Sequence, residues 1–102
     1  MPCTLEDLLQ KTERMVRLAA KIKAQRTQFS GLIKFVYIER CLREGAISAV
    51  PSGGGEHTWM RKYMLHGLHV VVNHRIEPPA ILEVYWARQT ESFVCEAVRK
   101  FE

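Results

Sequence analysis

The stretch HTWMRKYMLHGLHVVVNHR, residues 57–75, decides the fold predicted for this chain. It contains two runs rich in apolar and β-branched residues, 57–65 and 68–75, separated only by His66-Gly67. Two such runs joined by two residues, the second of them glycine, are typical of a tight β-hairpin. We therefore predict that residues 57–75 form two antiparallel strands.

This turn also predicts which side chains share a face of the hairpin. It places Leu65 opposite Leu68, and successive side chains then point to alternate faces of each strand. One face collects the apolar residues Trp59, Tyr63, Leu65, Leu68, Val70 and Val72, with Arg61 and His74 at its rim. The other face is mixed, with Met60, Lys62, Met64, His69, Val71, Asn73 and Arg75. A slip of one residue would exchange the two faces.

The residues that follow predict a third strand and a helix. Glu77-Pro78-Pro79 predicts a turn, because proline cannot donate to a strand ladder. A strand over 81–88 adds Leu82, Val84 and Trp86 to the apolar face and Ile81, Glu83 and Tyr85 to the mixed one. A helix then begins near Thr90, with one face formed by Phe93, Val94, Ala97, Val98 and Phe101.

The N-terminal half predicts two helices and a loop. Thr4 suits a helix N-cap, and apolar residues at alternating spacings of three and four predict a long amphipathic helix over 5–28. Residues 32–44 fit either a helix or a strand, with 32–38 the ambiguous part. We predict a helix, because it would end at Gly45, a residue favoured at helix ends. Residues 51–55, Pro-Ser-Gly-Gly-Gly, predict a flexible connector.

Together these elements predict a single α+β domain over residues 1–102. Two N-terminal helices and a C-terminal helix pack on a small three-stranded antiparallel meander. The chain is 47% apolar and 25% charged, as is usual for a folded protein. No stretch approaches the ~18 apolar residues of a membrane span, and the N-terminus has no signal-peptide pattern.

Three widely spaced cysteines show no disulfide or zinc pattern, which favours a reducing cytoplasm. His66, His69 and His74 lie close in sequence, but His69 and His74 are predicted on opposite faces, so we expect no metal site. No motif for a cofactor, a dinucleotide or a nucleophile triad is present, so we expect no cofactor and lean against an enzyme.

The charge is concentrated in the first half of the chain. The net charge is +4, and residues 1–50 carry nine Lys and Arg against five Asp and Glu. The excess includes Lys11, Arg14, Arg17 and Lys21 on the predicted helix over 5–28. Such a face is either solvated or available to a polyanion. The same helix is a candidate homodimer interface.

The mixed sheet face is the second candidate binding surface. Lys62 and Arg75 could hold phosphate, Tyr85 could stack on a base, and His69 and Asn73 add polar groups. The face is otherwise an ordinary solvated side of an antiparallel sheet. These features predict a small basic binding protein that regulates or inhibits by occupying a nucleic acid or the acidic surface of a nucleic-acid-handling complex.

Two alternatives remain open at this point. One is a metal-independent endoribonuclease in which His69 and Glu83 move protons and Lys62 and Arg75 hold the phosphate. The order of helices followed by an antiparallel meander resembles, in architecture alone, bacterial endoribonuclease toxins of the RelE and colicin type. The other is a homodimeric adaptor that binds no nucleic acid, in which surplus large apolar residues such as Phe29, Phe35 and Tyr37 form the interface.

Overall fold

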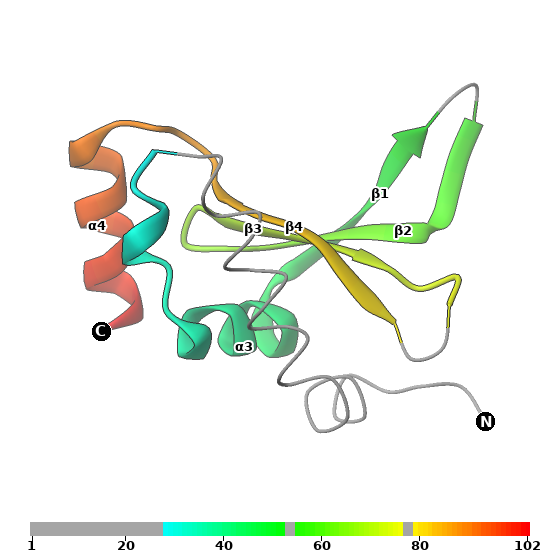
Figure 1. The fold of residues 1–102 in the computed structure, drawn as a ribbon, viewed down its shortest axis with the longest axis horizontal. Helices are drawn as coiled ribbons and strands as arrows, with labels where there is room; N and C mark the ends of the chain where they lie inside the picture. Colours follow the sequence, from blue (N-terminus) through cyan, green and yellow to red (C-terminus); the bar gives the residue numbers. More distant parts are fainter. Residues whose placement is uncertain (1–27, 53–54, 77–78) are drawn as a thin grey trace.

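The computed structural model describes residues 28–52, 55–76 and 79–102. These residues form one antiparallel sheet of four strands, in the order β1-β2-β3-β4, together with two α-helices. The elements in chain order are η1 (Ser30–Leu32), α3 (Phe35–Glu44), β1 (Ala46–Ser52), β2 (Gly55–Leu65), β3 (Leu68–Asn73), β4 (Ala80–Trp86) and α4 (Glu91–Phe101). Figure 1 shows α3 beneath the sheet and α4 at one end of it. The predicted α+β class is confirmed.

The sheet has four strands, so the predicted three-stranded meander is wrong in this detail. The additional strand is β1, and the predicted connector over 51–55 is partly strand, because Pro51 and Ser52 end β1 and Gly55 begins β2. The sequence of β1, AISAVPS, has little intrinsic strand preference. Pairing with β2 forms this strand, and such pairing is not a local property of the sequence.

The predicted hairpin and its register are confirmed. Leu65 pairs with Leu68, and Tyr63 pairs with Val70. The turn residue His66 has φ 50° and Gly67 has φ 84°. Both values are left-handed, as a two-residue hairpin turn of the primed type requires. The turn lies against α4, since a Cβ at Gly67 would come within 2.5 Å of Cζ of the Phe93 ring.

The ambiguous segment 32–44 is helical, as predicted, over the shorter range of α3. The helix ends at Gly45, but the reason differs from the one predicted. Gly45 has φ −68°, an ordinary value for any residue. A Cβ there would collide with the carbonyl oxygens of Cys41 and Met64, so glycine is needed for space between α3 and β2. The predicted helix over 5–28 lies outside the described residues apart from Gln28, which is in a turn.

The core lies between the helices and the predicted apolar face of the sheet. It includes Tyr37, Ile38, Cys41, Leu42, Tyr63, Leu68, Val70, Val72, Ile81, Val84, Trp86, Val94, Ala97 and Phe101. Ile81 was predicted on the mixed face, and this is wrong. A bulge makes Val71 pair with Glu83 but Val72 pair with Ile81, so one residue is skipped and Ile81 turns into the core, 7% exposed.

Candidate functional site

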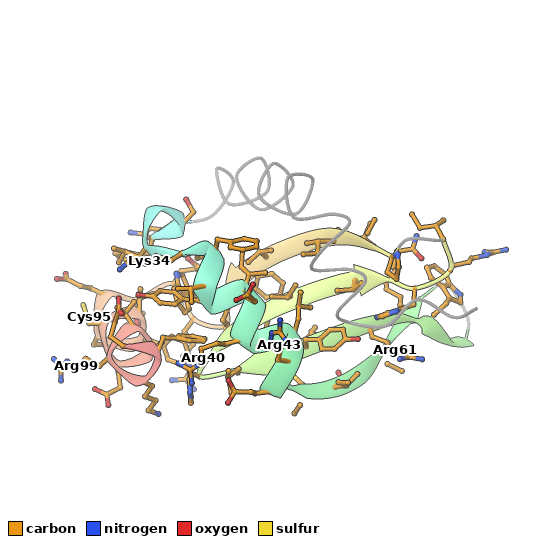
Figure 2. All side chains as sticks on the ribbon, turned by 90° about the horizontal axis from the view of Figure 1, so that it is seen from below. Lys34, Arg40, Arg43, Arg61, Cys95 and Arg99 are labelled. Carbon is orange, nitrogen blue, oxygen red and sulfur yellow. The ribbon has the colours of Figure 1, made fainter. Side chains whose placement is uncertain are left out.

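The face of the sheet opposite the core carries the predicted mixed set of side chains. The buried residues of both α3 and α4 belong to the core cluster, so among the described residues neither helix covers this opposite face. We call it the open face. Figure 2 views the molecule from the α3 side, with the open face behind the sheet. Lys62, His69 and Tyr85 are half-buried there, around Val71, which is 7% exposed.

Three polar side chains from three strands converge on the open face. His69 on β3 pairs in register with Tyr85 on β4. Their rings lie 5.1 Å apart, and His69 Nδ1 and the Tyr85 hydroxyl are joined by a long hydrogen bond of 3.4 Å. Lys62 on β2 places Nζ 6.0 Å from the centre of the Tyr85 ring. The ammonium group and the two rings therefore form one compact cluster.

The surroundings of His69 favour its neutral form. Burial lowers the pKa of His69 below its ordinary value of 6.5, and the positive charge of Lys62 lowers it further. At neutral pH the ring therefore offers one nitrogen donor and one acceptor. The cluster holds a fixed cation, an amphipathic phenol and a neutral imidazole, which suits a ligand with both a flat ring and a negative charge.

Two other predicted site residues lie apart from this cluster. The side-chain oxygen of Asn73 accepts a hydrogen bond of 2.8 Å from the backbone N–H of Arg75, so Asn73 supports the turn after β3. The guanidinium of Arg75 lies 5.7 Å from the centre of the Trp59 ring. Trp59 has the strand parity of the buried Tyr63, so Arg75 turns away from the open face. The prediction that Arg75 lies on the mixed face is therefore wrong.

Glu83 lies on the open face, opposite Val71, and is exposed. No contact between Glu83 and His69 occurs among the interactions described. The predicted residues Lys11, Arg14, Arg17 and Lys21 lie outside the described residues.

A second polar cluster lies on the helix side of the sheet and was not predicted from the sequence. The Tyr63 hydroxyl is hydrogen-bonded to His74 Nε2 at 2.8 Å. Burial, and then the charge of Arg61, lower the pKa of His74, while burial raises the pKa of Tyr63. The predicted register already contained the signal, because Arg61 and Tyr63 share a face and His74 pairs beside them.

Other cations on the helix side are engaged in structural contacts. Lys34 pairs with the Glu102 carboxylate at 2.8 Å, and the same carboxylate accepts the Tyr37 hydroxyl. Arg40 pairs with Glu44 at 3.1 Å and donates to the Phe101 carbonyl at 2.8 Å. Figure 2 shows Lys34 and Arg40 along α3. The contacts of Lys34, Tyr37 and Arg40 with Phe101 and Glu102 join α3 to the end of α4.

The buried cysteine is not a candidate nucleophile. Burial raises the pKa of Cys41 to about 12, and its thiol donates to the Tyr63 carbonyl at 3.3 Å. A thiolate, the reactive form, is therefore scarce at this position near neutral pH. Within residues 28–52, 55–76 and 79–102, no group of three His, Cys, Asp or Glu side chains is arranged to hold a metal ion. No helix in that part of the chain is long and apolar enough to span a membrane.

Comparisons with protein-family models, curated proteins and solved structures give no match for this chain. The described residues form an α+β domain whose four-stranded antiparallel sheet has polar and aromatic side chains on its open face.

Proposed function

We propose that the chain binds single-stranded nucleic acid on the open face of its sheet. The observation that carries the proposal is the cluster of Lys62, His69 and Tyr85 on a face that neither described helix covers. Single-stranded nucleic acid is bound by aromatic side chains that stack on its bases and by cations beside its backbone.

Each member of the cluster has a distinct role in this proposal. Tyr85 and His69 provide flat rings for a base, and Lys62 provides the charge for the neighbouring phosphate. Met60 and Met64 share the face and offer flexible apolar contact beside the rings. The carboxylate of Glu83 lies on β4, two strands from Lys62, so the backbone is expected to follow the β2 side.

Binding without cleavage is the role that the geometry supports. Cleavage was expected to need a proton-transfer pair of His69 and Glu83 with Arg75 as a second cation. The partner of His69 is instead Tyr85, and Arg75 lies against Trp59. The remaining group of one cation and two rings is sufficient for binding.

The test measures the affinity of the full chain for a fluorescent 12-nucleotide single-stranded RNA by anisotropy over a range of salt concentrations. Lys62→Gln is expected to weaken binding and to reduce the log–log salt slope by about 0.7, the contribution of one released counterion. Lys100→Gln, on the exposed side of α4, is the control with the same charge change. Tyr85→Ala is expected to cost about 1–3 kcal/mol, roughly 5- to 150-fold, and Tyr85→Phe much less.

Two further results sharpen this test. Removing the negative charge with Glu83→Gln is expected to tighten binding. Affinity is also expected to rise as the pH falls from 7.5 to 5.5, because a bound phosphate counters the Lys62 charge and lets His69 accept a proton. Equal losses for Lys62→Gln and Lys100→Gln would show that binding is non-specific attraction and would overturn the proposal, as would an absence of binding at low salt.

A further inference from the structure

Strand β1 is the outermost strand on its side of the described sheet. Its residues 46–49 are all exposed, and Ile47 is 53% exposed. None of these four residues is charged. An uncharged edge strand with exposed backbone is a template for pairing with another strand.

The register shows which backbone groups of β1 point outward. In a two-residue hairpin the residues flanking the turn exchange both hydrogen bonds, so Leu65 bonds Leu68. Every second residue of β2 before Leu65, namely Tyr63, Arg61 and Trp59, then also bonds β3. The 2.6 Å hydrogen bond from the His74 N–H to the Trp59 carbonyl agrees with this alternation.

The residues of β2 between these positions must bond β1. They include Met64, opposite Ala46, and Lys62, opposite Ser48. The N–H and C=O groups of the alternate residues, Ile47 and Ala49, therefore face away from the sheet.

The usable part of this edge is short. The register shifts between Ala49 and Val50, which ends the regular ladder, and Pro51 has no N–H to donate. The free edge thus offers the outward groups of Ile47 and Ala49 and no more. Ile47 and Ala49 lie symmetrically about Ser48. The outward groups of one copy can therefore pair with those of a second copy related by a two-fold axis at Ser48.

We propose that two copies of the chain pair antiparallel through β1, with the two-fold axis at Ser48. Ile47 of each copy then exchanges two hydrogen bonds with Ala49 of the other, so that all the outward groups are satisfied. The large Ile47 side chain lies beside the small Ala49, and no like charges meet. A register centred on Ile47 would need the N–H of Gly45, which already donates to the Cys41 carbonyl at 2.9 Å.

The pairing forms one eight-stranded sheet with the two open faces side by side. Lys62 lies opposite Ser48, so the two copies of Lys62 fall in one row three strand spacings apart, about 14 Å. The dimer is inferred from the edge alone and does not depend on the proposed function. A ladder of three residues from each copy buries less than the ~800 Å² per partner of a standard interface, so a weak, concentration-dependent dimer is expected.

Sedimentation velocity of the full chain from about 5 to 500 μM tests the proposal at concentrations suited to a weak dimer. The wild-type chain is expected to shift toward a dimer as concentration rises, and Ile47→Lys is expected to abolish this shift. Ile76→Lys is the matched control, since Ile76 is 50% exposed in the bend after β3, and it should dimerise like the wild type. Unchanged thermal melting of both variants shows that they fold.

Disulfide trapping tests the register. In a background with Cys3 and Cys95 replaced by serine, Ser48→Cys should form a covalent dimer much faster than Ile76→Cys, because residues on the axis lie within bonding distance. A chain that stays monomeric throughout overturns the proposal and leaves the edge to an extended peptide of another protein. Dimerisation that Ile47→Lys does not weaken also overturns it, because another surface is then responsible.

Discussion

Replacing Gly67 with alanine perturbs the turn that sets the register of the sheet. Gly67 has φ 84°, a left-handed value that L residues adopt at a cost of about 1–2 kcal/mol. The added Cβ would also lie 2.5 Å from Phe93 Cζ and 2.6 Å from Cε1. Ordinary contact is about 3.5 Å or more, so the ring must move by roughly 1 Å.

The two effects together set the expected loss of stability. Phe93 is half-buried, so its ring can turn away from its preferred rotamer, and this adds about 0.5–1 kcal/mol to the cost of the backbone. Gly67→Ala should therefore lower the free energy of unfolding by about 1.5–3 kcal/mol. With a urea m-value of about 1.2 kcal/mol/M, the midpoint moves down by roughly 1–2.5 M.

Urea unfolding followed by tryptophan fluorescence measures this shift. Gly31→Ala is the control, because a Cβ at Gly31 would meet nothing within 4 Å, and its effect should stay within about 0.5 kcal/mol. In a Phe93→Ala background the contact disappears, and only the backbone cost of about 1–2 kcal/mol should remain. A Gly67→Ala variant as stable as Gly31→Ala would refute both parts of the reasoning.

Two further predictions concern titratable groups that are wholly or partly buried, compared with exposed ones. His69 and His74 both have a pKa below 6.5 in the folded chain, so the unfolded chain binds protons more readily and stability should fall as the pH drops below about 7. Thermal melting at pH 7.5, 6.5 and 5.5 should show this fall in stability, and the fall should be smaller in the double variant His69→Gln/His74→Gln. If the melting temperature falls equally with pH in both proteins, groups other than these two histidines are responsible. At pH 8 a thiol reagent should label the exposed Cys95 quickly and Cys41, with its pKa near 12, only after unfolding. Peptide mapping by mass spectrometry reads this out, and rapid labelling of Cys41 in the native chain would contradict its described burial.

Within the strands, the alternation of side chains predicted which residues of the candidate site share a face of the sheet. The His66-Gly67 turn placed Lys62 and His69 on one face, the predicted strand over 81–88 added Tyr85, and the three do converge. Alternation says nothing beyond the end of a strand. β3 ends at Asn73, so Arg75 follows the bend and lies against Trp59.

The errors in the strands have non-local causes. β1 has small residues with weak strand preference, and its pairing with β2 supplies what local preference does not. The bulge in β4 skips one residue between Glu83 and Ile81, which a regular period of two cannot anticipate. Ile81 therefore faces the core instead of the open face.

The sequence by itself determined the hairpin, its register and the start of α4, because turn dihedrals, capping and side-chain alternation depend on residues close together in the chain. Thr90 shows this at the start of α4, where its hydroxyl accepts the Phe93 N–H at 3.3 Å. Only the tertiary structure decided that β1 joins the sheet as an edge and that α4 lies at one end of the sheet, with its buried residues in the same core as those of α3. Those outcomes depend on strand pairing and apolar burial between distant segments, and they determine which face and which edge of the sheet remain exposed.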